Sequence, residues 1–304
     1  MRIRYNLWLL LYLIAFASCK KSTVTQTKSK EEIVAVTPQE ESLDVKLTKK
    51  TTLIERVVFF NETELVKGVK EAKLSYIDKN LQPMVLFFFK VDLNEKQLVL
   101  KPLTPNGDKK YAMQSIPDMI KTNQFSGLKV VGAVNADFFN TSTGEPRSIV
   151  YLKGEAVRTI LPEIRSYFGI NQNGKPFIGD HSVFSQQRST IFDALGGYHR
   201  LIKQSLPVKQ TDVSIHPRTA VGFTANNMVY FLVADGRNAN YSNGLTLAQV
   251  AEIMAALEVK EAINLDGGGS STFVINTSQI EVKNKPSDGS PRKVANGWAI
   301  CIKN

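Results

Sequence analysis

The sequence predicts an α+β fold, in which a single mixed, strand-rich domain has a central β-sheet flanked by helices. Three observations favour this fold. Short apolar runs of strand length recur along the chain, separated by Gly, Asn and Asp turn residues. Helical spacing of apolar residues is clear only at 245–258, with a shorter candidate at 115–124. Residues 51–304 suffice for one sizeable core, and no internal repeat or second linker divides them.

The predicted strands account for most of that domain. Each is rich in Val, Ile, Phe or Leu, and turn residues join the paired runs. Asn173 and Gly174 form the strongest turn signal, because both tolerate the positive φ that a tight hairpin needs. In chain order the predicted strands are 83–93 paired with 96–103 around Asn94 and Glu95, then 128–139, the hairpins 148–158, 165–180 and 219–235, and the short strands 261–265 and 271–275.

The helix predicted at 245–258 has a defined start and a defined buried face. Thr246 is suited to cap its first turn, and Gln249, three positions later, completes a capping box. Its apolar residues recur at helical spacing, so they indicate a core face and not a ligand site. They are Leu247, Val250, Ala251, Met254 and Leu257.

The N-terminus predicts export and lipid anchoring. Two arginines precede the apolar run 7–17, which is too short to span a bilayer permanently and matches a secretory signal. Small residues then precede Cys19, as in a bacterial lipobox. We therefore expect 1–18 to be a lipoprotein signal peptide and Cys19 to be acylated; the alternative is an ordinary cleavage site with an incidental cysteine. Because Lys20 and not an aspartate follows, the expected location is the bacterial cell envelope, at the outer membrane facing the periplasm.

Composition limits the classes of partner. Residues 19–50 are rich in Lys, Glu, Ser and Thr and lack aromatic residues, so we expect a disordered tether. The formal net charge is +10, but the basic residues are scattered among acids, which gives no support to nucleic-acid binding. A modest basic excess does suit an anionic ligand. Cys301 lies in the stretch WAICI and is expected to be buried, without a disulfide partner if Cys19 is acylated.

Polar clusters follow three strongly apolar strands. Asp137, Asp235 and Asp266 stand just past the runs KVVGAV, MVYFLV and EAINL. Strand ends and the loops after them are where sites are commonly built. If these strands belong to one sheet and end on the same side, the three acids converge, which the sequence leaves as a hypothesis.

The stretch NLDGGGSST, at 264–272, is the most unusual of these clusters. Three consecutive glycines are unfavourable in a strand or helix, but they let backbone N–H groups approach an anion as a nest. Arg218 and Arg237, near two other strand ends, are suited to bidentate contacts with phosphate oxygens. The stretch does not match a P-loop, a dinucleotide-binding turn or a nucleophile elbow, and no histidine is clearly placed to activate Ser270. The predicted binding set is Asn135, Arg218, Thr219, Arg237, Asn264, Gly267, Gly268, Gly269, Ser270 and Ser271.

At these motifs the sequence resembles the phosphodiester glycosidase family. The resembling segments, in the family's order, are NADFF, ALGGYHRLIKQ, HPRTAVGF, VADGR, GLTLAQVAEIMAALE, AINLDGGGSSTFV and PRKVANGWAI. The resemblance is specific over 129–304, the expected core of the glycosidase domain. It is loose over 51–128, an N-terminal part of the same globular domain.

The resemblance implies a hydrolase that cleaves the bond between a sugar, such as N-acetylglucosamine, and a phosphodiester in an envelope or glycan substrate. Asp266 and Asp137 are the candidates for the nucleophile or base, with Asp235 third. Arg218, with Arg237 and the glycine-turn amides, is assigned to the phosphate. The side chains expected to orient the sugar or the carboxylates are Asn135, Thr219, Asn264 and Ser271.

Two alternatives from other classes remain. In a metal-dependent phosphodiesterase the three aspartates hold Mg²⁺ or Ca²⁺ through oxygens, and no other cofactor is predicted. In a non-catalytic envelope lipoprotein the same residues bind a sugar-phosphate polymer. Because every acid of the motifs is present, the enzyme is favoured.

Overall fold

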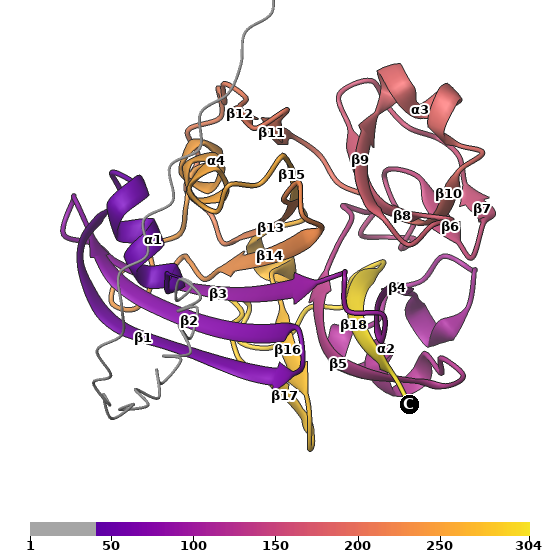
Figure 1. Ribbon diagram of the computed structural model, residues 1–304, viewed down its shortest axis with the longest axis horizontal. Helices are drawn as coiled ribbons and strands as arrows, with labels where there is room; N and C mark the ends of the chain where they lie inside the picture. Colours follow the sequence, from indigo (N-terminus) through magenta and orange to yellow (C-terminus); the bar gives the residue numbers. More distant parts are fainter. Residues whose placement is uncertain (1–40) are drawn as a thin grey trace, which may run out of the picture. The chain divides into compact units, whose positions relative to one another are not determined.

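Three antiparallel sheets and four α-helices make up residues 41–304, which the computed structural model describes (Figure 1). The predicted signal peptide, Cys19 and most of the predicted tether lie outside these residues. The α+β fold class is confirmed, with one difference. Helices cover one face of the central sheet, whereas two further sheets cover the other face.

The central sheet, called the large sheet below, has eight strands. β3 lies inside it because the run PMVLFFFKVD is apolar on both faces. Phe88 packs on the helix-covered side, while Phe87 and Phe89 pack on the opposite side, as the alternation of side chains along a strand requires. The strand order is β1 (Ile54–Val66), β2 (Val69–Asp78), β3 (Pro83–Asp92), β14 (Met228–Ala234), β13 (Arg218–Phe223), β15 (Glu261–Leu265), β11 (Arg200–Lys203) and β12 (Leu206–Pro207).

The other two sheets have five strands each and are named after β8 and β5. Their aromatic side chains pack against the large sheet in one core, which contains Phe168, Phe231, Phe273 and Trp298. The β8 sheet has the order β7 (Glu155–Arg158), β6 (Val150–Leu152), β10 (Ile191–Gly196), β8 (Ser166–Asn171) and β9 (Pro176–Asp180). The β5 sheet has the order β17 (Ile280–Val282), β16 (Phe273–Asn276), β5 (Leu128–Asn135), β18 (Gly297–Lys303) and β4 (Leu98–Leu103).

The helices form the outer layers. α1 (Leu43–Lys50) and α4 (Leu247–Ala256) cover the large sheet, α2 (Ile116–Thr122) covers the β5 sheet, and α3 (His181–Gln187) packs on the β8 sheet through Phe184. The capping box predicted at the start of α4 is confirmed. No helix within residues 41–304 has the length and apolar character needed to cross a membrane.

The local strand predictions are confirmed and one pairing is wrong. The hairpins at 148–158, 165–180 and 219–235 form as expected. β3 and β4, however, do not pair: β3 lies between β2 and β14 in the large sheet, and β4 pairs with β18 in the β5 sheet. Strand partners are chosen by non-local packing, which a turn signal does not report. β1 and β2 were not predicted, because polar and charged residues interrupt their apolar pattern. The strands β10, β11, β12, β17 and β18 were also not predicted.

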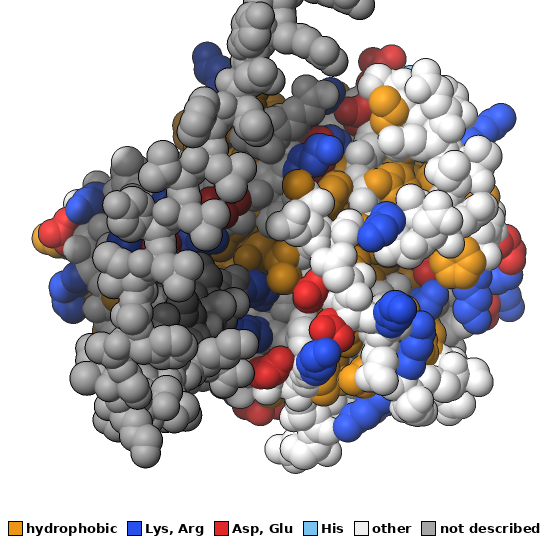
Figure 2. Space-filling model, viewed as in Figure 1, with side chains coloured by type: hydrophobic (Ala, Val, Ile, Leu, Met, Phe, Trp, Pro, Cys, Tyr) orange, Lys and Arg blue, Asp and Glu red, His pale blue; other side chains and the backbone are white. Residues whose placement is uncertain are grey.

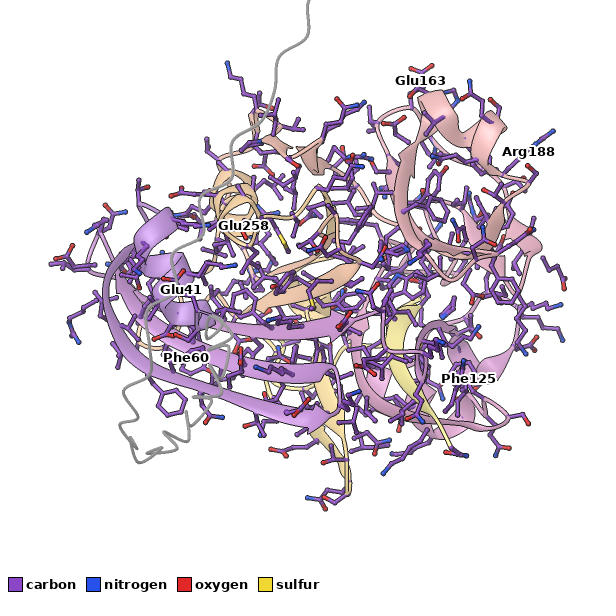
Figure 3. The ribbon with its side chains drawn as sticks, viewed as in Figure 1. Glu41, Phe60, Phe125, Glu163, Arg188 and Glu258 are labelled. Carbon is purple, nitrogen blue, oxygen red and sulfur yellow. The ribbon has the colours of Figure 1, made fainter. Side chains whose placement is uncertain are left out.

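The predicted tether is wrong at its end, because 43–50 forms α1. Leu43 and Leu47 are four residues apart, so both face the same side and are buried in the core beneath α4. Lys46 and Lys50 bind Glu258, with Nζ–Oε distances of 3.2 and 2.6 Å. Glu258, labelled in Figure 3, lies just past the end of α4. The helix is therefore part of the globular domain.

Replacing Phe273 with alanine is expected to destabilise the domain by about 3–5 kcal/mol, the cost of a cavity left by a fully buried ring. Phe273 is 0% exposed and stacks on Phe89 of the large sheet with 3.9 Å between ring centroids. Urea unfolding measures the effect. Phe59→Ala, at a ring that is 49% exposed, is the matched control and should cost less than about 1 kcal/mol. Equal losses for the two variants would contradict this packing role.

Candidate active site

The candidate site lies where the three sheets meet. Asp266 follows β15 of the large sheet, Asp137 follows β5 of the β5 sheet, and Arg165 precedes β8 of the β8 sheet. The Asp266 N–H donates to the Ala136 carbonyl over 2.8 Å, which ties the two acidic strand ends together. Arg165 Nη1 lies 3.6 Å from Asp137 Oδ1. The structure thus brings two of the three predicted acids together beside an arginine that the sequence hypothesis missed.

Asp137 is held by backbone contacts in a buried position. The Ser148 N–H donates to Asp137 Oδ2 over 2.8 Å, and the Asp137 N–H donates to Asn296 Oδ1 over 2.8 Å. Burial raises the pKa of Asp137 to about 8, although Arg165 and the Ser148 N–H lower it; the nearby Asp266 carboxylate raises it further. The Asp137 carboxyl group is therefore mostly protonated at neutral pH.

Asp266 has a different environment. Burial raises the pKa of Asp266 only to about 6, because the Ser270 hydroxyl and the Arg292 guanidinium favour the ionised form. Ser270 Oγ is close enough to lower this pKa, although no hydrogen bond of ordinary geometry joins it to another residue within 41–304. An ionised Asp266 thus lies near a protonated Asp137, and carboxyl groups with separated pKa values can divide the roles of base or nucleophile and acid.

A buried hydrogen-bond network fixes the backbone at Asp266. Asn135 Nδ2 donates to the Asp266 carbonyl over 2.6 Å. Asn135 Oδ1 accepts from Thr219 Oγ1 at 2.9 Å and from the Thr272 N–H at 3.0 Å, and Ser271 Oγ lies 3.3 Å from Thr219 Oγ1. These side chains are at most 1% exposed. Asn135, Thr219 and Ser271 were expected to orient either the sugar or the carboxylates. The network supports the second role, because it fixes the backbone of Asp266.

Two glycines of the triplet make room for arginines. A Cβ on Gly268 would lie 3.0 Å from Arg237 Nη2. A Cβ on Gly269 would overlap Arg292 Nη2. Gly267 lies against the backbone of a neighbouring segment: a Cβ added to it would be 2.6 Å from the carbonyl oxygen of the residue before Arg218. The close backbone at Gly267 and the φ of +60° at Gly268 therefore favour glycine, whereas the neighbours of Gly269 are the mobile ends of two side chains.

The amides of the turn are already used within the fold. The Gly268 N–H donates over 2.8 Å to the carbonyl just before β13. The Ser270 and Ser271 N–H groups donate to the carbonyls of Gly267 and Gly268, at 3.1 and 3.2 Å, and close the 3₁₀ turn η2 (Gly268–Ser270). The predicted anion nest is therefore wrong for the Gly268 amide, and the Ser270 and Ser271 amides serve to close the turn itself.

Arg218 is a buried side chain that braces the backbone around it. Its Nε donates to the Leu245 carbonyl over 3.0 Å and its Nη2 to the Ser214 carbonyl over 2.6 Å. Because these bonds use two of its nitrogens in a side chain that is 8% exposed, the structure supports a bracing role for Arg218, and its assignment to a phosphate stays a prediction. Arg237 fits that role better, since it is exposed and its guanidinium lies over the glycine turn.

Two arginines that the sequence hypothesis missed influence the carboxyl pair. The Arg165 guanidinium lies over the rings of Phe138 and Tyr198, 5.2 and 4.8 Å from their centroids, which limits its movement. Arg292 pairs with Asp288 at 2.6 Å above the glycine turn. Both positions carried a signal: Arg292 lies in the resembling segment PRKVANGWAI, and Arg165 stands at the start of a predicted hairpin.

Asp235 does not join the other two acids. Its Oδ1 accepts from Asn284 Nδ2 at 3.0 Å, and its Oδ2 accepts from the Lys285 N–H at 2.8 Å and the Tyr241 hydroxyl at 3.2 Å. Burial raises the pKa of Asp235, and these hydrogen bonds oppose the rise. The structure therefore does not bring Asp235, the third candidate for the nucleophile or base, to the carboxyl pair, and the three-aspartate metal site of the phosphodiesterase alternative is not assembled within residues 41–304. Within residues 41–304 no three His, Cys, Asp or Glu side chains are grouped to hold a metal ion.

Several buried polar atoms on the residues around the carboxyl pair have no hydrogen-bond partner in the described part of the chain. Such atoms are costly when unpaired, so their clustering indicates a place where a polar ligand or water binds. They are Asp137 Oδ1, Ser148 Oγ, Asn264 Oδ1, Ser270 Oγ and Asn296 Nδ2.

A cavity of about 470 Å³ is lined by Arg165, the neighbour of Asp137, although neither carboxyl group of the pair lines it. His199, Lys209 and Glu163, which is labelled in Figure 3, also line it. Burial lowers the pKa of His199 and so favours its neutral imidazole. The volume lies within the range of small-molecule sites. On the described part of the face in Figure 2, acidic side chains lie among the basic ones.

Comparisons with known proteins identify the family of the chain. A protein-family model described as phosphodiester glycosidase matches residues 128–301. The N-acetylglucosamine-1-phosphodiester alpha-N-acetylglucosaminidase of Bos taurus is 28% identical over 232 residues, which cover 67% of this chain and 42% of that protein. The Homo sapiens protein of the same name is 39% identical over 198 residues, which cover 56% and 37%. This chain therefore spans less than half the length of these curated relatives.

Two solved structures share the fold. The catalytic domain of zebrafish N-acetylglucosamine-1-phosphodiester alpha-N-acetylglucosaminidase, auto-inhibited by its pro-peptide, superposes with a TM-score of 0.61 at 21% identity, covering 84% of this chain and 87% of that one. A hypothetical protein from Synechocystis superposes with a TM-score of 0.62 at 12% identity, covering 81% and 64%. The family match extends over more than half of the chain and includes both carboxyl groups of the site. The chain belongs to the phosphodiester glycosidase family.

Proposed function

We propose that this protein hydrolyses the glycosidic bond between a sugar and a phosphodiester in an envelope or glycan substrate. The observation that carries the proposal is the carboxyl pair: the backbone of Asp266 is bonded to Ala136 beside Asp137, Arg165 lies 3.6 Å from Asp137, and burial raises the pKa of Asp266 to about 6 and that of Asp137 to about 8. At neutral pH one group is ionised and the other protonated, as glycoside hydrolysis requires. Family membership supports the same reaction, and the curated relatives are named for N-acetylglucosamine, so we propose this sugar first.

The bond that breaks joins the anomeric carbon to a phosphate oxygen. Its electron pair passes to that oxygen, and Asp137 donates a proton there. A water oxygen bonds to the anomeric carbon, either directly with Asp266 as base or after Asp266 has formed a glycosyl ester. Because the leaving phosphate monoester is already a stable anion, proton donation contributes less than in ordinary glycosidases, and neutralisation of the phosphate contributes more.

Three arginines supply that neutralisation in our proposal. Arg165, held over two rings, presents a guanidinium fork that suits phosphate oxygens. Arg237 and Arg292 approach from the side of the glycine turn. The cavity lined by Arg165 receives the alcohol on the other side of the phosphate.

Incubation with a panel of sugar-1-phosphodiesters in ¹⁸O-water tests the proposal. We expect the label in the released sugar and none in the phosphate. Label in the phosphate would instead identify a phosphodiesterase. Tight binding of the substrates without release of sugar would identify a binding protein.

The activity is expected to have a bell-shaped pH dependence with limbs near pH 6 and pH 8. Below about 6 Asp266 becomes protonated and loses its nucleophilic or basic function, so kcat/KM falls as the pH decreases. Above about 8 Asp137 loses the proton that it donates, so kcat/KM falls as the pH increases. Initial rates at low substrate concentration between pH 4 and 10 measure the profile. Activity that rises steadily through pH 8 would contradict the assignment of Asp137.

We also propose that the protein is anchored at Cys19 in the cell envelope, at the outer membrane facing the periplasm. The support is the sequence alone: the short apolar run, the small residues before Cys19 and Lys20 after it. Metabolic labelling with a radioactive fatty acid tests this, with Cys19→Ser as the control. Equal labelling of both proteins would overturn the proposal.

A further inference from the structure

We propose that Asp235 is a positioning residue: its carboxylate holds the segment 283–292 and thereby places the Arg292 guanidinium against the glycine turn, next to Asp266. The inference rests on the proposed function and adds a residue to it. It assigns a role in that reaction to a residue that does not belong to the carboxyl pair.

The Asp235 carboxylate joins two sheets. Asp235 follows β14 of the large sheet, and its partners Asn284 and Lys285 follow β17 of the β5 sheet. A carboxylate only accepts hydrogen bonds, which matches the three donors around Asp235. In Asp235→Asn the side-chain NH₂ group would face one of these donors, and that hydrogen bond would be lost. Asp235 is 1% exposed, so a donor that loses its hydrogen bond to this carboxylate is left buried and unpaired, which costs free energy.

The segment that follows β17 is fixed at both ends. Asn284 Oδ1 accepts the Phe273 N–H at 2.8 Å, and Asn284 Nδ2 also donates to the Ser271 carbonyl at 3.0 Å. At the other end, backbone bonds of 2.9 and 3.0 Å join Val294 to Gln114. Asp235 therefore secures the end of the segment that is tied to the glycine turn.

Arg292 is carried by this segment to the reacting centre. Its Nη2 lies where a Cβ on Gly269 would stand, and its partner Asp288 belongs to the same segment. Their side chains are 40% and 36% exposed, and an exposed ion pair orders little by itself. The position of Arg292 thus depends on the path of the backbone that Asp235 secures. Burial raises the pKa of Asp266, and Arg292 and Arg165 both lower it, so displacement of Arg292 changes this titration.

Carboxyl ¹³C NMR of the protein labelled at aspartate tests the inference without any substrate. The Asp266 resonance is titrated in the wild type, Asp235→Asn, Arg292→Gln and the double variant. We expect each single variant to raise the pKa of Asp266 by up to about 1 unit, the low end of what a nearby opposite charge produces. The double variant should shift no further than Arg292→Gln. The acidic limb of kcat/KM should move upward by the same amount.

Two further variants make the test specific. Tyr241→Phe removes a contact with Asp235 that does not involve the segment, and should leave the Asp266 titration unchanged. Asn284→Ala breaks the other side of the Asp235 contact and should reproduce Asp235→Asn even if that variant folds poorly. An unchanged Asp266 titration in folded Asp235→Asn or Asn284→Ala, or additive shifts in the double variant, would overturn the inference. Because NMR reports the titration and ¹⁸O-labelling reports the reaction, failure of either proposal is recognised separately.

Discussion

Replacing Asp266 with asparagine is expected to lower kcat by roughly 10⁴-fold or more, the loss seen when a group acting directly on the reacting atom is removed. An amide neither attacks the anomeric carbon nor accepts a proton from water. The fold should persist, because Asp266 is held through its backbone: its N–H bonds to Ala136 and its carbonyl to Asn135. The loss therefore reports chemistry and not unfolding.

Release of sugar by the purified variant measures this loss. Asp118→Asn is the matched control, since Asp118 is exposed on α2 and takes no part in the site. A decrease smaller than about tenfold in Asp266→Asn would remove Asp266 from the reaction. The anomer first released by the wild type then separates its two roles, because retention requires a covalent ester and inversion requires a base.

Replacing Asp137 with asparagine is expected to lower kcat by roughly 10²-fold while stabilising the protein at alkaline pH. The catalytic loss lies at the low end for an acid because the leaving phosphate is a stable anion. The gain in stability follows from linkage. Burial raises the pKa of Asp137 to about 8, so the folded state binds this proton more tightly than the unfolded chain, and stability declines as the pH rises from about 4 to about 8.

Thermal unfolding and kinetics at pH 5 and pH 9 check both effects. Asp137→Asn should raise Tm at pH 9, change it little at pH 5, and abolish the alkaline limb of the activity. Asp193→Asn is the matched control at a buried acid outside the site, where loss of the 2.9 Å ion pair with Lys101 should lower Tm and leave kcat unchanged. A lower Tm for Asp137→Asn at pH 9 would show that its burial does not penalise the charged form.

Local signals in the sequence were sufficient for most of the secondary structure. The turn at Asn173 and Gly174 and the capping box of Thr246 depend on residues a few positions apart, and both are present. The partner of β3 depends on which strands bury its two faces, which no local pattern encodes. The same limit applies to α1. Its two buried leucines are too few to predict a helix unless the surface on which they pack is already known.

The site was predictable in part for a similar reason. Asp137 and Asp266 each follow an apolar strand, so their position at a strand end could be predicted from the sequence. Asp235 has the same signature and precedes a glycine as Asp266 does, but its carboxylate is enclosed by three donors. Arg165 is a lone charged residue whose role depends on two rings distant from it along the chain. A residue whose role depends on tertiary contacts cannot be recognised from the spacing of residues along the sequence.

The meeting of three sheets at the site has a consequence for how the protein loses activity. One sheet supplies Asp266, a second supplies Asp137 and a third supplies Arg165, so no sheet on its own contains a working centre. Separation of any two layers removes a charged group from the site. Inactivation by denaturant should therefore follow the disruption of the whole core, and a fragment that lacks one layer should be inert even where its remaining strands stay paired.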